Sequence, residues 1–245
     1  MSVPVERAEQ ARALMLELFP EGFEEAEADG GVELVAYTTP GGEERLWQAF
    51  GGAVATDVDE DWADRWRRFH RPVEVAGLWI GPPWEPPPED VPTVVIDPGR
   101  AFGTGAHPTT RLCVELLARV PRGSVLDVGC GSGVLAIAAA RLGHGPLVGV
   151  DVDPVAVEAA RENARANGVE LDAHVLDATL EPLPKADLAV ANIALEPVVA
   201  IAGRLDSERV ITSGYLVSDE PDLTGFPAME RVEAEGWAAD LHLRA

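Results

Sequence analysis

The feature that most constrains the fold is a glycine-rich turn after an apolar segment, in residues 125–133, which read Val-Leu-Asp-Val-Gly-Cys-Gly-Ser-Gly. The apolar part predicts a buried strand, and the small residues that follow predict a helix over 132–142. Gly129, Gly131 and Gly133 let the backbone turn tightly and approach a ligand where a Cβ would collide. The helix N-terminus adds N–H groups and a positive dipole end. This order of strand, turn and helix predicts a ligand site at the edge of an α/β sheet.

Two details of the turn distinguish between two kinds of ligand. The dinucleotide pattern GxGxxG requires Gly or Ala where this chain has Val134, and the loop here is GxGxG. Asp127 stands two residues before Gly129, where a carboxylate favours a cation, directly or through water, and disfavours a pyrophosphate. The turn therefore favours S-adenosylmethionine (SAM), whose amino acid end carries a cation. A nicotinamide dinucleotide stays the rival ligand.

Two further acidic residues follow predicted strands. Asp151 ends the strand predicted over 147–151, where a carboxylate can accept hydrogen bonds from both ribose hydroxyls. The alternative is that Asp151 only caps the next helix, but Asp153 is better placed for that. Asp177 follows the third strand and either meets an adenine amino group or is a plain loop carboxylate. Asp151 indicates a nucleoside without saying which one.

Strands and helices alternate through the second part of the chain, which predicts a parallel sheet covered by helices on both faces. The helices are predicted over 132–142 and 154–167, the second with Pro154 at its first position. The tail, 229–245, is expected to add a hairpin that closes the sheet. The strands are predicted over 124–127, 147–151, 171–176, 188–191 and 209–212.

The first part of the chain has the pattern β-α-β-β-α-β, which predicts a small ferredoxin-like α+β domain over 1–58. Asp29-Gly30-Gly31 is a good hairpin turn between its second and third strands. A connector follows over 59–92, with a short helix that carries Trp62 and Trp66 on one face, and then a proline cluster. The remaining 93–245 is the predicted ligand-binding domain. The four strands are predicted over 2–5, 23–28, 32–38 and 53–58, and the two helices over 6–19 and 43–50.

The composition restricts the partners. The net charge is −23, from 42 acidic and 19 basic residues. Such a field repels phosphate backbones and attracts a basic protein, although the acid excess alone also keeps a protein in solution. Cys113 and Cys130 form neither a CxxC pair nor a disulfide framework, as expected in a reducing compartment. The first ten residues lack the apolar core of a signal peptide, and no apolar run approaches a membrane span. We therefore expect a cytoplasmic protein.

One further segment narrows the class. Residues 96–110 read Ile-Asp-Pro-Gly-Arg-Ala-Phe-Gly-Thr-Gly-Ala-His-Pro-Thr-Thr. They resemble the DPGxAFGTGxHxTT signature of the PrmA family, bacterial methyltransferases of the eleventh protein of the large ribosomal subunit. Ala191-Asn192-Ile193, the Asp-Trp-Ala-Asp-Arg-Trp of 61–66 and the Gly-Pro-Pro-Trp of 81–84 also resemble that family. The resemblance implies the class I methyltransferase fold, a Rossmann-like seven-stranded sheet, with a small N-terminal domain that grips the substrate.

The resemblance also implies the site. The SAM contacts of the family fall on Thr110, Gly129, Asp151 and Asn192, and Phe102 and Thr104 lie in the loop expected to cover the methionine end. With the residues singled out above, the full set of expected cofactor contacts is Phe102, Thr104, Thr110, Asp127, Gly129, Gly131, Gly133, Asp151, Asp177 and Asn192. No metal is expected, because His107 has no second ligand at useful spacing.

The expected activity is a SAM-dependent protein-lysine N-methyltransferase, acting on lysine ε-amines, the N-terminal α-amine or both. Asn192 is the expected catalytic residue, since a carbonyl there can accept an N–H bond and aim the amine lone pair. A monomer is expected. No direct reading of nucleic acid is expected, because Ile193-Ala194-Leu195 after Asn192 supplies no ring to stack on a flipped base. The rivals are another protein lysine or a small amine as acceptor, a nicotinamide-dependent oxidoreductase, and a non-catalytic SAM-binding module. Residues 219–245 look short for the family.

Overall fold

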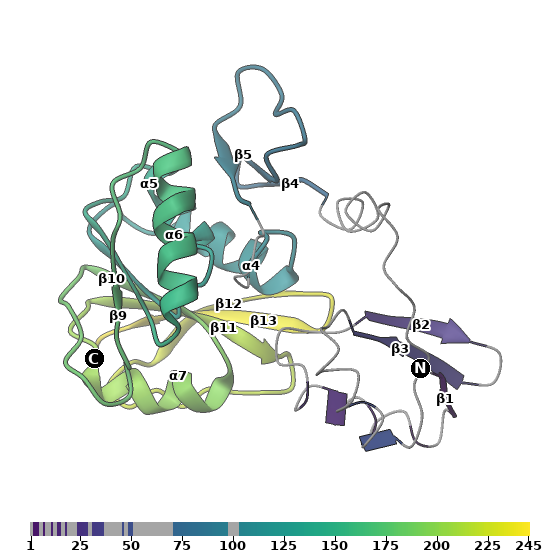
Figure 1. Ribbon diagram of the computed structural model, residues 1–245. Helices are drawn as coiled ribbons and strands as arrows, with labels where there is room; N and C mark the ends of the chain where they lie inside the picture. Colours follow the sequence, from purple (N-terminus) through teal and green to yellow (C-terminus); the bar gives the residue numbers. More distant parts are fainter. Residues whose placement is uncertain are drawn as a thin grey trace. The chain divides into compact units, whose positions relative to one another are not determined.

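The chain forms two compact units, Met1–Ala63 and Asp64–Ala245. The computed structural model (Figure 1) describes residues 71–97 and 103–245 continuously. From the first unit it describes residues 2–4, 7, 11, 14, 15, 18, 24–28, 31–36, 46, 49 and 50. The described part of the predicted connector, residues 71–92, groups with the second unit.

The first unit contains a three-stranded antiparallel sheet. Its strands are β1 (Ser2–Pro4), β2 (Glu24–Ala28) and β3 (Gly31–Val35), in the order β1-β3-β2. Helical residues pack on it, and the shared core includes Val3, Ala11, Met15, Val32, Leu34 and Leu46. The strand predicted over 53–58 lies outside the described residues, so the ferredoxin-like pattern stays a prediction.

The second unit is built on a seven-stranded sheet, as predicted. The sheet order is β12-β13-β11-β10-β7-β8-β9. Five strands are parallel, and β13 enters antiparallel between β11 and β12. The tail therefore forms the predicted hairpin. The strands are β7 (Val125–Val128), β8 (Leu147–Asp151), β9 (Asp172–Val175), β10 (Leu188–Asn192), β11 (Arg209–Leu216), β12 (Ala228–Ala234) and β13 (Trp237–Leu243).

Helices cover both faces of this sheet (Figure 1). On one face lie α4 (Pro108–Leu117), α5 (Val134–Arg141) and α6 (Pro154–Ala166), and on the other lies α7 (Leu195–Ile201), followed by the 3-10 turn η2 (Ala202–Arg204). Successive strand residues point to opposite faces, so Val125 joins the first core and Leu126 the second. The predicted helices α5 and α6 are confirmed, whereas α4 and α7 were not predicted.

A second small sheet lies within the predicted connector. It comprises β4 (Val73–Val75), β5 (Leu78–Gly81) and β6 (Thr93–Val95), in the order β4-β5-β6. The proline cluster is the excursion between β5 and β6. Asn167 ties this sheet to α6, because its side chain accepts from the Val95 N–H at 2.9 Å and donates to the Val95 carbonyl at 2.6 Å. In the part of the chain that the structure describes, no helix is long and apolar enough to cross a membrane.

Candidate functional site

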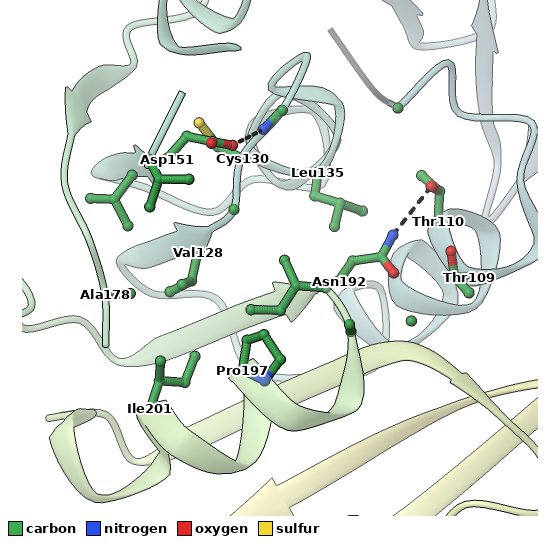
Figure 2. A pocket seen from close by; sticks show the side chains of 18 of the residues that line it. Thr109, Thr110, Val128, Cys130, Leu135, Asp151, Ala178, Asn192, Pro197 and Ile201 are labelled. Carbon is green, nitrogen blue, oxygen red and sulfur yellow. Dashed lines mark hydrogen bonds between the residues drawn. The ribbon is translucent and has the colours of Figure 1, made fainter. Parts of the chain in front are cut away.

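A cavity of about 670 Å³ opens along the carboxyl ends of the parallel strands. Ligands of open α/β sheets bind at this edge. Figure 2 shows Asp151 and Ala178 on one side of the pocket, Thr109 and Thr110 on the opposite side, and Asn192 between them. Residues at or next to six strands and on the three helices α4, α5 and α7 thus meet in one pocket.

The glycine turn forms one side of this pocket. Each of its three glycines has a positive φ angle, a conformation that residues with a side chain rarely adopt. The φ angles are 71° at Gly129, 51° at Gly131 and 80° at Gly133. A Cβ on Gly129 would lie 2.4 Å from the Ile193 side chain. Gly129 and Gly131 line the pocket. Gly133 lies outside the lining, and instead its missing side chain lets the start of α5 approach Ala160 of α6.

Asp127 lies behind the turn, outside the pocket lining. Its carboxylate accepts a hydrogen bond from the Ala136 N–H, at 3.1 Å, in the first turn of α5. Since Gly133 at the N-cap has no side chain to cap the helix, Asp127 supplies the cap from the preceding strand. Burial raises the pKa of Asp127 to about 7; the Ala136 N–H opposes this shift and the charge of Asp151 adds to it. Asp127 thus lies beneath the loop and not in the pocket lining, and its expected effect on a bound cation stays a prediction.

Asp151 presents its carboxylate at the pocket edge. One oxygen accepts from the Gly131 N–H and the other from the Asp153 N–H, each at 3.0 Å. The helix cap is Asp153, which accepts from the Val155 N–H at 2.8 Å. The glycine turn therefore orients Asp151, and Asp153 rather than Asp151 caps the helix. The remaining lone pairs of the Asp151 carboxylate can accept hydrogen bonds from the hydroxyls of a sugar.

Asp177 and Asn192 also line the pocket, on two different strand ends. Asp177 accepts from both the backbone N–H and the hydroxyl of Thr179, at 2.8 and 2.6 Å, and these hydrogen bonds hold its pKa below the usual value. The Asn192 amide donates to the Thr110 hydroxyl of α4 at 3.4 Å. This contact orients the amide so that its oxygen is the atom that can accept from a substrate N–H.

The loop before α4 is described only in part. Phe102 lies outside the described residues, so its expected contact stays a prediction. Thr104 is not among the lining residues; its hydroxyl accepts from the Ala106 N–H at 3.4 Å. Gly103 does line the pocket, and its carbonyl accepts from the Ser132 hydroxyl at 2.5 Å, which joins this loop to the glycine turn.

The lining residues that the sequence analysis did not expect as ligand contacts include His107, Gly214 and Trp237. His107 caps the N-terminus of α4, and its ring lies edge-on to Trp237, with centroids 4.9 Å apart and planes at 70°. Gly214 sits at a bulge in β11 with φ 101°, where a Cβ would lie 2.1 Å from the carbonyl oxygen of Ile193. For His107 the sequence offered a signal, because a proline such as Pro108 is typical of the first position of a helix and marks His107 as its N-cap.

The order of the sheet, the reversed last strand and a pocket built from a glycine turn and a strand-end aspartate define the class I methyltransferase fold. Comparison with known proteins gives the family. The model of the ribosomal protein L11 methyltransferase (PrmA) family matches residues 24–239. The chain belongs to this family.

Individual relatives agree with that assignment. The chain is 47% identical over 179 residues to the ribosomal protein L11 methyltransferase of Geobacter sulfurreducens, which covers 69% of this chain and 59% of the relative. The identity to the ribosomal protein L11 methyltransferase of Symbiobacterium thermophilum is 43% over 205 residues, and this match covers 76% of this chain and 66% of the relative. The matches thus span about three fifths of the relatives' length. The crystal structure of a ribosomal protein L11 methylase from Lactobacillus delbrueckii subsp. bulgaricus superposes with a TM-score of 0.61 at 31% identity, over 69% of this chain and 95% of that one.

Proposed function

We propose that this chain binds SAM in the described pocket and transfers its methyl group to amines of ribosomal protein L11. The observation that carries the proposal is the carboxylate of Asp151, which the Gly131 N–H holds at the strand end beside the glycine turn. The membership in the L11 methyltransferase family supports the choice of substrate.

The pocket residues fit such a ligand. Asp151 would accept from the ribose hydroxyls, and Ala178 and Asp177 lie next to it for the adenine. Gly129 and Gly131 line the pocket without side chains, which leaves room there for the methionine part. Asp127 adds negative charge from below the loop once it is ionised. When bound, SAM supplies an activated methyl group on a positively charged sulfur.

The residues of this chain would act mainly by positioning. The amine must be uncharged to offer its lone pair, and an ordinary lysine has a pKa of about 10.4. Apolar lining residues such as Val128 and Leu135 lower that pKa, because they disfavour the charged form. The Asn192 oxygen would then accept an amine N–H and turn the lone pair toward the methyl group. This arrangement needs no dedicated general base.

The alternatives differ in what they bind. A nicotinamide dinucleotide would bring an anionic pyrophosphate to the turn above Asp127 and would meet Val134 at the third motif position. Another protein lysine or a small amine would use the same pocket with a different acceptor. A non-catalytic module would bind SAM and transfer nothing.

The proposal has a two-part test. Calorimetry with the wild-type chain should detect binding of SAM and none of NAD, and Asp151→Ala should weaken SAM binding by more than about tenfold, as expected for the loss of charge-assisted hydrogen bonds. Incubation with methyl-labelled SAM and purified L11, followed by mass spectrometry, should place the label on amine nitrogens. Binding of NAD instead of SAM would overturn the proposal, and an unlabelled L11 would overturn the proposed substrate.

Four finer parts belong to the same proposal. The first unit, Met1–Ala63, would dock the substrate protein, whose basic surface the charge of −23 attracts. The chain would act as a monomer and would not read nucleic acid. It would work in the cytoplasm, where ribosomal proteins are made and assembled.

A further inference from the structure

We propose that Trp237, braced by His107, determines acceptor specificity by contacting the aliphatic part of a lysine side chain. We call these two residues the acceptor wall. The inference rests on the proposed function, because it requires an amine acceptor. It predicts that the pocket prefers a lysine ε-amine over an α-amine, which has no alkyl chain to contact.

The position of the wall follows from the sheet order. Asp151 ends β8, Gly129 follows β7, Asn192 ends β10 and Trp237 begins β13, and β8, β7, β10, β11 and β13 are consecutive in the sheet. The residues for the nucleoside thus lie at one end of the pocket, and Trp237 lies at the other. From β10 to β13 is two strand spacings, about 10 Å. That gap accommodates the four-methylene chain of a lysine between Asn192 and the indole.

The turn that carries the indole is tied to two neighbouring elements. Trp237 closes a tight turn in which Glu235 and Gly236 both have positive φ, 52° and 82°, and it pairs with Leu216 of the neighbouring strand. An ion pair of 2.6 Å between Arg111 and Glu235 ties this turn to α4. A wall fixed from two elements can select a substrate without first paying the entropy of ordering its own side chain.

The second residue of the wall is fixed as well. His107 caps α4, and its Nδ1 lies 2.7 Å from the Thr109 hydroxyl. The edge-on contact with Trp237 is a favourable aromatic geometry. Burial, and then the charge of Arg111, lower the pKa of His107, against an opposing effect of Glu235. The wall is therefore neutral at neutral pH and does not repel an acceptor chain.

The chemistry of this wall suits an alkyl amine. The indole face removes methylene groups from water, and each buried methylene contributes about a fourfold gain in binding. The same apolar surface lowers the pKa of the amine and so raises the fraction with a free lone pair.

Two Trp237 variants test the inference, with Met229→Ala as matched control, because Met229 is an exposed apolar residue of the same hairpin outside the pocket lining. Trp237→Ala should lower kcat/KM for lysine ε-amines of L11 by more than about tenfold, whereas Trp237→Phe, which keeps an aromatic face, should lose less than about threefold. The ratio of ε-amine to α-amine labelling should fall in Trp237→Ala. The SAM dissociation constant, from calorimetry, should change less than about twofold in all three variants.

A measurement without turnover complements this test. The indole N–H resonance of Trp237, assigned by its loss in Trp237→Phe, should shift when Nα-acetyl-lysine amide is added and stay in place with Nα-acetyl-alanine amide. If the wild type labels L11 and Trp237→Ala keeps its rate and its ε-to-α ratio, the inference is overturned and the proposed function stands. If the wild type labels no protein, the proposed function fails, and an unmoved indole resonance would then overturn the inference separately.

Discussion

At the scale of single residues, Asp127 shows how the fold sets charge beside the glycine turn. Its carboxylate is 1% exposed and caps α5 from behind. Burial raises its pKa from 3.8 to about 7 in the folded chain. A raised carboxyl pKa means that the folded state prefers the protonated form. Its contribution to stability is therefore fully present below the unfolded pKa and is lost as the pH rises through about 7.

Replacing this carboxyl by an amide should remove that dependence. Asp127→Asn keeps an oxygen that can accept from the Ala136 N–H but cannot ionise. Between pH 5 and 8 the unfolding free energy of the wild type should fall relative to the variant by on the order of 2 kcal/mol. Urea denaturation at both pH values measures the difference. Parallel curves for the two proteins would contradict the assigned pKa.

Asn192 provides the second prediction at this scale. Its amide nitrogen is engaged with Thr110, and its oxygen is the proposed acceptor for the substrate amine. Asn192→Ala should lower turnover more than about tenfold, because the amine loses its orientation. SAM affinity, measured by calorimetry, should fall much less than turnover. Normal kinetics in the variant would exclude the role.

At the scale of elements, the bulge in β11 shapes the pocket. Gly214 faces the segment that follows Asn192, and no side chain fits there because the Ile193 carbonyl is too close. Bulges next to sites redirect the chain locally. The bulge allows the end of β10 to turn into α7 beneath the pocket.

A pair of glycine variants separates this packing from backbone strain. Gly214→Ala and Gly225→Ala both place a side chain at positive φ, 101° and 84°, but only the first meets other atoms within 4 Å. Strain alone costs about 1–3 kcal/mol. Gly214→Ala should lose at least about 1 kcal/mol more in denaturation and should also weaken SAM binding. Equal losses in the two variants would refute the packing argument.

Local patterns in the sequence were sufficient for most of the second unit. The strands β7 to β11 and the helices α5 and α6 have apolar periodicity and clear boundaries, such as Pro154 at the start of α6. The small sheet β4-β5-β6 was not predicted, because its strands are three or four residues long and its prolines dominated the pattern. Its turn carries positive φ at Ala76 as well as at Gly77, and Ala gives no sequence signal for that conformation.

Some residues of the site could likewise be predicted from local sequence, and others could not. Gly129 and Asp151 follow strands directly, so their place at the sheet edge could be predicted from strand positions alone. His107, Gly214 and Trp237 line the pocket because distant segments pack together, and no local spacing links them. Asp127 was predicted to act near the turn, but its burial beneath the loop follows from the packing of α5 on the sheet.

At the scale of the whole molecule, the chain is divided into two units, and we expect each unit to have its own function. Every described residue that lines the pocket belongs to Asp64–Ala245. The first unit has a separate core of its own. Cofactor binding and substrate docking are therefore expected to be separable.

Removal of the first unit tests this separation. A chain of residues 64–245 should bind SAM with a dissociation constant within about threefold of the full chain, because the pocket is intact. It should label L11 at less than about one tenth of the full rate, since docking is lost. Circular dichroism verifies that the truncated chain is folded. Full labelling by this chain would refute the docking role.

The insertion of β13 between β11 and β12 has a consequence for how the molecule is made. Among the described strands, β12 pairs only with β13. The earlier strand β12 can therefore join the sheet only after the later strand β13 has paired. Trp237, the first residue of β13, also closes the acceptor end of the pocket. A nascent chain that stops short of residue 237 thus lacks both the sheet edge and the last side of the cavity. Pairing of the last strand therefore completes the edge of the sheet and the lining of the cavity in one folding step.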